Sequence, residues 1–150
     1  MGTGVGSGAK EGEIQLAEET RMRGGQSLVE ELESCLAEWS ERTGIAVETW
    51  ALPRTDVPSP VSGAVMTVLH EALSNVERHS GARTVSIAVT AGKKGLRMTV
   101  SDNGRGFLAA GPARGIARMR AAFAEIGGTL SVNSVLGQGT TVSGAVPHHE

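Results

Sequence analysis

The chain has 150 residues, a formal net charge of −2, one cysteine and 3% aromatic residues. Its length suits one domain with one sizeable core, and its charge argues against binding to nucleic acid or to an anionic membrane surface. The single cysteine excludes an internal disulfide, and the sequence has neither a membrane-spanning run nor a signal-peptide core. We therefore expect a soluble, cytoplasmic protein.

The first 25 residues are expected to lie outside the folded domain, which we place at residues 26–150. Met1–Gly8 alternates glycine with small residues and matches neither the dinucleotide fingerprint nor the phosphate-binding loop, so it is typical of a disordered tail. Lys10–Arg23 is charged and only weakly periodic. We interpret it as part of this tail or as the end of an upstream helix.

The first clear element is an amphipathic helix over Gln26–Thr43, in which apolar residues recur at three- and four-residue steps. Ser27 and Glu30 are spaced to form a capping box at its start, and Gly44 is suited to its end. The single cysteine falls in the apolar stripe and is expected to be a core thiol. A strand is expected next, over Ile45–Leu52.

The stretch Pro60–Ser80 carries the most information, because its apolar residues follow helical spacing while polar residues interrupt its apolar face. Glu71, Asn75 and His79 fall at positions i, i+4 and i+8, so they form one stripe along the helix. A buried face carries such groups only when their hydrogen bonds are satisfied. The stripe indicates either a helix with a polar edge or one wall of a cleft for a polar ligand.

Four more strands and one more helix are expected after this stretch. The strands are Arg83–Thr90, Leu96–Ser101, Thr129–Val132 and Thr140–Val146, and the helix is Ile116–Ile126. The turn residues Lys93-Lys94-Gly95 indicate a hairpin between the first two of these strands. Together the elements predict an α+β fold, a two-layer α/β sandwich in which about three helices cover one face of a mixed sheet of about five strands.

Polar, glycine-rich clusters stand at the ends of these elements. The sequence DNGRG, Asp102–Gly106, directly follows a strand, Gly115 opens the last helix, and the sequence GQGT, Gly137–Thr140, leads into the last strand. Each cluster alone is explained by a turn. Their fixed order behind the E-x-x-x-N pattern of Glu71 and Asn75 makes the combination much more specific.

This combination resembles the ATP-binding domain of the GHKL superfamily over about Ser27–Pro147. The stretches SERTGIAVE, HEALSNVERHS, VSDNGRGF and GQGTTVSGAVP are most similar to two-component sensor histidine kinases of the nitrate-sensor class. The resemblance implies a histidine-kinase-like ATPase fold that binds ATP and Mg²⁺. It also implies transfer of the ATP γ-phosphoryl group to a histidine on a separate dimerisation domain, and from there to a response regulator.

The resemblance assigns five residues to the adenine end of the nucleotide. The Asp102 carboxylate would accept a hydrogen bond from the adenine amino group and would repel the carbonyl group that guanine places there. Gly104 and Gly106 would let the backbone approach the base and let the following loop hinge. Gly139 leads into Thr140, whose hydroxyl would support Asp102 and the adenine edge.

The resemblance assigns five further residues to the phosphate end. Asn75 would offer its amide oxygen to Mg²⁺, and Arg78 and His79 would reach phosphate oxygens. Gly115 would let backbone N–H groups at the start of a helix face the phosphates. Two roles remain open for Glu71, which would either position a Mg²⁺-bound water or act as a general base.

Some features depart from the family pattern. Ala113 stands where the first of two paired glycines is expected, and the nucleotide lid, Leu108–Arg114, is very short. His70 lies inside the nucleotide-binding helix and is therefore not interpreted as the phosphorylated histidine. We expect the dimerisation and phosphoacceptor domain to be absent from this chain, which would then be a monomer. The parent protein can be membrane-anchored even though this segment is expected in the cytoplasm.

Two other functions remain open from the sequence. A stand-alone serine kinase of the anti-sigma-factor type belongs to the same superfamily and needs no attached phosphoacceptor domain. A non-catalytic interaction module that kept the fold and lost the nucleotide is supported only by Ala113. Against the module, Asn75 and Asp102 are both present, and a hydrophobic core alone gives no reason for either.

Overall fold

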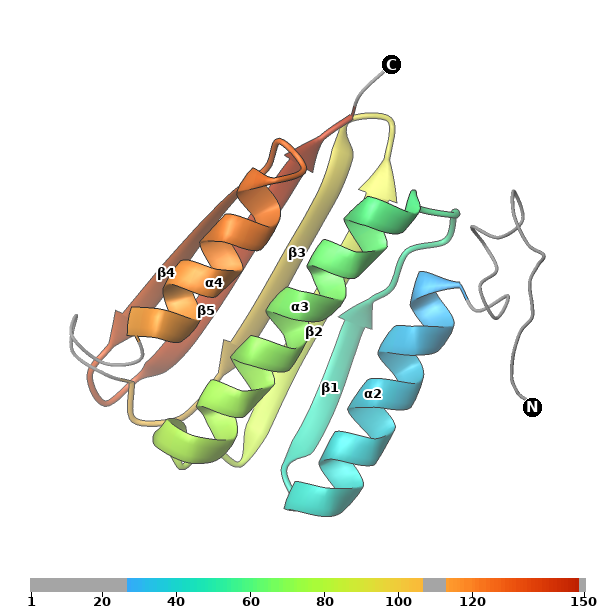
Figure 1. Ribbon diagram of the computed structural model, residues 1–150. Coiled ribbons are helices and arrows are strands. Elements are labelled where there is room, and N and C mark those ends of the chain that lie inside the picture. Colours follow the sequence, from blue (N-terminus) through green and yellow to red (C-terminus); the bar gives the residue numbers. More distant parts are fainter. Residues whose placement is uncertain (1–26, 107–112, 149–150) are drawn as a thin grey trace, which may run out of the picture.

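A five-stranded sheet forms one layer of the protein, and the helices packed on one of its faces form the other (Figure 1). The computed structural model describes residues 27–106 and 113–148. In this part of the chain the helices are α2 (Leu28–Thr43), α3 (Ser59–Asn75), the π-helix η2 (Val76–Ser80) and α4 (Ala113–Ala124). The strands are β1 (Ala46–Ala51), β2 (Thr84–Gly92), β3 (Gly95–Asp102), β4 (Thr129–Val135) and β5 (Gly139–Pro147).

The strand order in the sheet is β1-β2-β3-β5-β4. β1 and β2 are parallel and all other neighbours are antiparallel, so the sheet is mixed. A parallel pair needs a crossover connection, and α3 lies in the connection between β1 and β2. Lys93 and Lys94 form the turn between the paired residues Gly92 and Gly95, as predicted. The predicted two-layer sandwich with a mixed sheet and helices on one face is confirmed.

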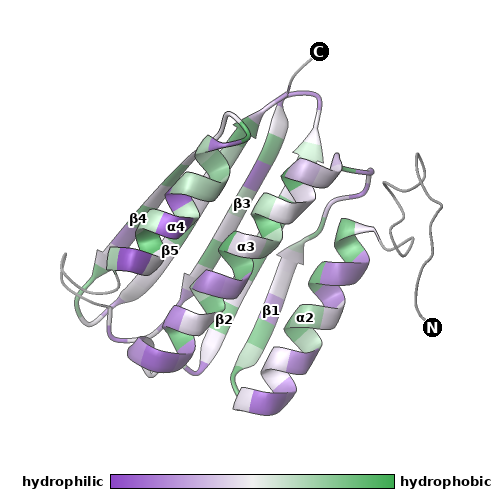
Figure 2. Ribbon diagram, in the orientation of Figure 1, coloured by the Kyte–Doolittle hydropathy of each residue, from purple (hydrophilic) through white to green (hydrophobic). Residues whose placement is uncertain are grey.

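The core lies between the helices and the covered face of the sheet. Along β2 and β3, buried residues alternate with more exposed ones, which is the two-residue period of a strand with one covered face. The buried apolar residues of these strands are Val85, Ile87, Val89, Leu96, Met98 and Val100. Figure 2 shows hydrophobic colour along most of α3 and hydrophilic colour at its lower end, where it continues into η2. The continuous helix therefore packs one face into the core along most of its length and exposes Glu77, Arg78 and His79 in η2.

Local sequence explains the boundaries of α2. The Ser27 hydroxyl accepts a hydrogen bond from the Glu30 backbone N–H at 3.3 Å, and the Glu30 carboxylate accepts one from the Ser27 N–H at 3.1 Å. These two bonds form the predicted capping box. Gly44 ends the helix with a φ angle of 79°. Cys35 packs against the core, and burial raises the pKa of its thiol.

Most element boundaries differ from the prediction by one or two residues, and three differences are larger. The last five residues of the predicted helix Pro60–Ser80 form the π-helix η2, in which the Ser80 hydroxyl donates to the Val76 carbonyl at 2.8 Å. α4 begins at Ala113, three residues before the predicted start, and β4 extends to Val135. Apolar periodicity does not distinguish the π-helix from an α-helix, and it cannot locate the other two ends, because residues 113–115 and 133–135 are polar, small or exposed.

Two predicted features lie wholly or partly outside the described residues, namely the tail at residues 1–25 and residues 108–112 of the predicted lid. Residues 113 and 114, which were expected at the end of the lid, belong instead to the first turn of α4. Among the helices of the two described ranges, none is both long enough and apolar enough to cross a membrane.

Candidate functional site

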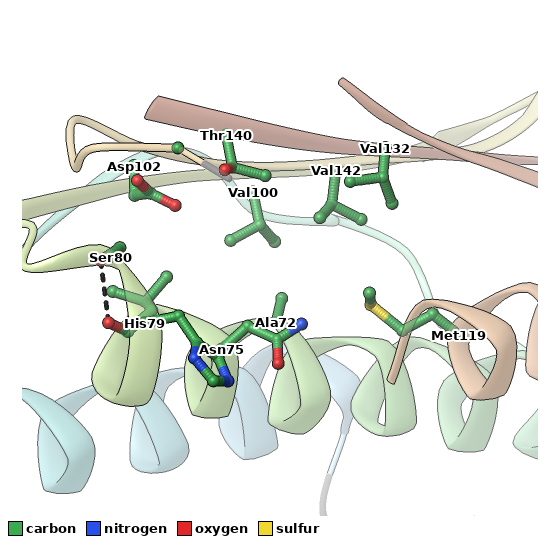
Figure 3. A pocket seen from close by; sticks show the side chains of 12 residues that line it. Ala72, Asn75, His79, Ser80, Val100, Asp102, Met119, Val132, Thr140 and Val142 are labelled. Atoms are coloured by element: carbon green, nitrogen blue, oxygen red, sulfur yellow. Dashed lines mark hydrogen bonds between the residues drawn. The ribbon is translucent and has the colours of Figure 1, made fainter. Parts of the chain in front are cut away.

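A pocket lies where the ends of β3 and β5 face the end of α3 and η2 (Figure 3). Its apolar wall consists of Ala72, Val76, Val100, Met119, Val132 and Val142. Its polar residues are Asn75, His79, Ser80, Asp102 and Thr140. Figure 3 shows Asp102 and Thr140 on the sheet side of the pocket and Asn75 and His79 on the helix side. An apolar pocket with a few polar groups at fixed places is the usual form of a small-molecule site.

Asp102, the last residue of β3, is partly buried in the pocket wall. Its Oδ1 accepts a hydrogen bond from the Gly104 backbone N–H at 2.8 Å, and the Thr140 backbone N–H also donates to the carboxylate. Burial raises the pKa of the Asp102 carboxyl, and these two hydrogen bonds oppose that rise. A carboxylate has about four lone-pair positions, so Asp102 retains acceptor capacity for a ligand.

Asn103 fixes the start of the loop that follows β3. Its side-chain oxygen accepts hydrogen bonds from the backbone N–H groups of Arg83 at 3.1 Å and Thr84 at 3.2 Å. Thr84 is the first residue of β2 and Arg83 directly precedes it, so the amide joins the loop to the neighbouring strand. The side chain of Asn103 thus has a structural role in holding the loop next to Asp102.

The same loop is attached to the end of η2. The Arg105 backbone N–H donates to the Ser80 carbonyl at 2.9 Å, and the Arg105 side-chain Nε donates to the His79 carbonyl at 3.0 Å. A Cβ atom added at Gly104 would lie 2.5 Å from the carbonyl oxygen of Ser80, so only glycine allows this approach. On the other side, the Arg105 carbonyl accepts a hydrogen bond from the Gly137 N–H. The loop up to Gly106 is therefore held from both sides.

The β4–β5 hairpin completes the sheet side of the pocket. The hydroxyls of Thr140 and Ser134 are 2.8 Å apart and share a hydrogen bond. Thr140 thus supports Asp102 through its backbone N–H, while its hydroxyl is paired with Ser134. Gly139 packs against the backbone of Asp102, and Gly106 packs against the backbone of Val135. Both glycines lie directly beside the site.

Of the residues predicted to bind the phosphate end of the nucleotide, some line the pocket and others lie outside it. Asn75 and His79 line the pocket, one at the end of α3 and one in η2. Arg78 is exposed and Gly115 is buried, and neither belongs to the pocket lining. Glu71 lies one helical turn before Asn75, also outside the lining, and packs against Gly115 of α4.

The carboxylate of Glu71 is engaged by Arg118 of α4. Arg118 Nε donates to Oε1 at 3.0 Å and its Nη2 donates to Oε2 at 2.9 Å, so the pair is bidentate. The hydrogen bonds from Arg118 lower the pKa of the Glu71 carboxyl, and the positive charge of Arg78 contributes in the same direction. This ion pair joins α3 to α4 beside the pocket.

The sequence identified most polar residues of the site but missed several that hold it together. Seven of the predicted residues either line the pocket or contact residues that line it, namely Asn75, His79, Asp102, Gly104, Gly106, Gly139 and Thr140. The residues that sequence reasoning missed are Ser80, Asn103, Arg105, Arg118 and Ser134. Their signal was weak, because four of them contact residues far away in the sequence or bond to backbone groups, and the Ser134–Thr140 contact depends on the pairing of β4 with β5.

Residues 61–150 match the protein family described as histidine kinase-, DNA gyrase B- and HSP90-like ATPase. The chain belongs to this family. Among its curated relatives, it is 35% identical over 126 residues to the sensor histidine kinase LiaS of Bacillus subtilis, covering 82% of this chain and 35% of LiaS. It is 34% identical over 123 residues to the sensor histidine kinase MctS of Rhizobium johnstonii, covering 77% of this chain and 26% of MctS.

The fold of this family member is also found in solved structures. The histidine kinase domain of the blue-light activated histidine kinase of Erythrobacter litoralis matches with a TM-score of 0.64 at 24% identity, covering 81% of this chain and 61% of that domain. The histidine kinase AdeS of Acinetobacter baumannii matches with a TM-score of 0.62 at 15% identity, covering 82% of this chain and 64% of the AdeS chain. These likenesses concern the fold. The chain spans about a third of LiaS and a quarter of MctS, so it corresponds to one part of these relatives.

Proposed function

We propose that this chain is the ATP-binding catalytic domain of a sensor histidine kinase, which transfers the γ-phosphoryl group of ATP to a histidine on a separate dimerisation domain. The observation that carries the proposal is the Asp102 carboxylate, which lines an apolar pocket opposite Asn75 (Figure 3). Membership of the ATPase family, together with the sensor histidine kinases among its relatives, supports the same function.

The pocket suits the adenine ring. Val100, Val142 and Met119 offer apolar contacts to a flat ring, and Asp102 accepts a hydrogen bond from the exocyclic amino group of adenine. Guanine carries a carbonyl oxygen at the same position of the ring. Two acceptors repel each other, so this site selects ATP over GTP.

Asn75 is the residue of this chain that would hold Mg²⁺. Its side chain lines the pocket, and magnesium takes most of its oxygen ligands from water and phosphates, so one amide oxygen fits its needs. Within the described ranges, no cluster of three or more His, Cys, Asp or Glu residues forms a metal site made by the protein alone. When bound, Mg²⁺ neutralises negative charge on the β- and γ-phosphates.

The remaining phosphate contacts come from η2 and α4. Arg78 and His79 at the end of η2 bind phosphate oxygens, and the backbone N–H groups around Gly115 in the first turn of α4 face the phosphates. In the transfer, the bond between the γ-phosphorus and the bridging oxygen breaks, a bond to an imidazole nitrogen forms, and ADP leaves. Glu71 positions a water near the phosphates, and a role as general base is its alternative assignment.

The finer part of the proposal is the nitrate-sensor class. The nitrate/nitrite sensor protein NarX of Escherichia coli is 36% identical over 76 residues, covering 50% of this chain and 13% of NarX. In this proposal the phosphorylated histidine passes its phosphoryl group to an aspartate of a response regulator, and the isolated domain is a cytoplasmic monomer. Neither a serine kinase nor a degenerate module is favoured, because LiaS and MctS are both named sensor histidine kinases.

Calorimetric titration with a non-hydrolysable ATP analogue tests the proposal, with and without Mg²⁺ and with the matching GTP analogue as a control. We expect binding that is selective for adenine and strengthened by Mg²⁺. A second assay supplies a histidine-bearing helical hairpin as a separate chain and follows transfer of label from γ-labelled ATP. Equal binding of the ATP and GTP analogues, or no binding at millimolar nucleotide, would show the proposal to be wrong.

A further inference from the structure

The Glu71 carboxylate lies one helical turn before Asn75, and each of its oxygens accepts a hydrogen bond. The guanidinium of Arg118 reaches Oε1 at 3.0 Å and Oε2 at 2.9 Å. The side chain of Glu71 is only 17% exposed, whereas that of Arg118 is 59% exposed. The side chain of Glu71 is therefore mostly covered, and its partner Arg118 lies at the protein surface.

The packing of α4 adds to this restraint. Gly115 is buried against Glu71, and a Cβ atom at this position would lie 2.5 Å from Oε2. Gly115 and Arg118 are three residues apart and thus share one face of α4. The backbone of α4 at Gly115 therefore packs against the carboxylate, and Arg118, one turn further along the same helix, forms the ion pair with it.

This geometry makes Glu71 a poor general base. A base that activates water needs a lone pair directed at the water and a pKa near the operating pH. A bidentate guanidinium occupies a lone pair on each oxygen. Arg118, aided by the charge of Arg78, also holds the pKa of Glu71 below its usual value, which moves it further from neutral pH.

We propose that Arg118 is a positioning residue that keeps Glu71 from activating water and thereby keeps hydrolysis of bound ATP slow. The inference rests on the proposed function, because it concerns loss of the same phosphoryl group to water. In hydrolysis, the water oxygen bonds to the γ-phosphorus, the bond to the bridging oxygen breaks, and ADP and phosphate leave. The proton of the attacking water goes to Glu71, and Arg118 obstructs this last transfer.

Steady-state hydrolysis of Mg²⁺-ATP by the 150-residue chain tests the inference. We expect Arg118→Ala to raise kcat about tenfold, a part of what general base catalysis supplies, with KM unchanged. In a Glu71→Gln background the same substitution should have no effect. Arg120→Ala is the matched control, because Arg120 lies on the same helix and donates to the Leu130 carbonyl at 3.4 Å. This control should hydrolyse ATP at the rate of the unchanged chain.

Titration with the non-hydrolysable analogue separates this inference from the proposed function. If the unchanged chain does not bind the analogue, the proposed function itself fails. If the Arg118→Ala chain binds it normally and its kcat does not rise, the inference alone is overturned. A rise that persists in the Glu71→Gln background, or a loss of analogue binding on removing Arg118, also overturns it, because Arg118 would then act on something other than Glu71. Arg118→Lys keeps the positive charge but cannot form the bidentate pair, so its kcat for ATP hydrolysis should lie between those of the unchanged chain and Arg118→Ala.

Discussion

Replacing Asp102 by Asn should separate nucleotide recognition from folding. The carboxylate faces the pocket and retains acceptor capacity after its hydrogen bonds to the N–H groups of Gly104 and Thr140. A hydrogen bond to a charged group contributes about 1.5–3 kcal/mol, which corresponds to about 10- to 150-fold in affinity. We expect Asp102→Asn to weaken binding of the ATP analogue by this factor and to reduce the preference over the GTP analogue.

The same substitution should leave the fold intact. The amide oxygen of Asn can accept the 2.8 Å hydrogen bond from Gly104, so the start of the loop keeps its anchor. Burial raises the pKa of Asp102, which means that the folded protein disfavours its charged form relative to water. A neutral amide removes that cost, so the unfolding temperature should stay the same or rise.

Two measurements on one protein preparation check this prediction. Calorimetric titration gives the affinities for the two analogues, and thermal denaturation without nucleotide gives the unfolding temperature. Asp56→Asn is the matched control, because Asp56 lies in the loop before α3 and is absent from the pocket lining. Undiminished affinity in the Asp102 variant would refute the role of this carboxylate. A clear fall in its unfolding temperature would refute the argument about burial.

The contacts around the site lead to three further predictions. Gly104→Ala should lower the free energy of unfolding by about 1–3 kcal/mol in urea titrations, because its Cβ would lie 2.5 Å from the Ser80 carbonyl oxygen. In the Asn75→Ala variant, Mg²⁺ should no longer strengthen binding of the ATP analogue, while the affinity measured without Mg²⁺ should be unchanged. Calorimetry with and without Mg²⁺ measures both affinities. Arg118 lowers the pKa of Glu71, so the associated stability is present above the ordinary Glu pKa of about 4.3 and is lost as pH falls through the folded-state value. Urea midpoints between pH 7 and 3 should therefore fall less steeply for Arg118→Ala.

The sequence predicted those parts of the fold that local rules determine. The capping box at Ser27, the turn at Lys93-Lys94 and the two strands that this turn joins depend on neighbouring residues, and each was found as predicted. The π-helix η2 was not predicted. Its amino-acid sequence continues the helical pattern, and the widened turn becomes visible only where Ser80 meets the loop after β3.

The candidate site shows the same division. Asp102 and Asn75 could be found because a carboxylate and an amide at the ends of apolar elements need a hydrogen-bonding partner, and a bound ligand supplies one. Arg118 could not be found, because 47 residues separate it from Glu71 and one more arginine on an exposed helix face does not stand out in a sequence. The contacts of Gly104 and Gly106 also needed the structure, which shows these glycines packed against the backbone of Ser80 and Val135, whereas the sequence analysis expected them to approach the base.

Base recognition and the restraint on Glu71 are built from different contacts, so they should vary independently. Asp102 takes its hydrogen bonds from Gly104 and Thr140, whereas Glu71 takes its hydrogen bonds from Arg118, and the two sets share no residue. Substitutions without shared partners usually add within about 0.5 kcal/mol.

The double variant Asp102→Asn/Arg118→Ala should therefore combine the raised KM for ATP of the first substitution with the raised kcat of the second. Steady-state hydrolysis over a range of ATP concentrations measures both quantities in all four proteins, and each effect in the double variant should agree within about twofold with its effect alone. The kcat of the double variant could instead be no higher than that of the unchanged chain. The effect of the Arg118–Glu71 ion pair on hydrolysis would then depend on how the adenine ring is bound. Recognition of the adenine and the restraint on Glu71 would then be energetically coupled.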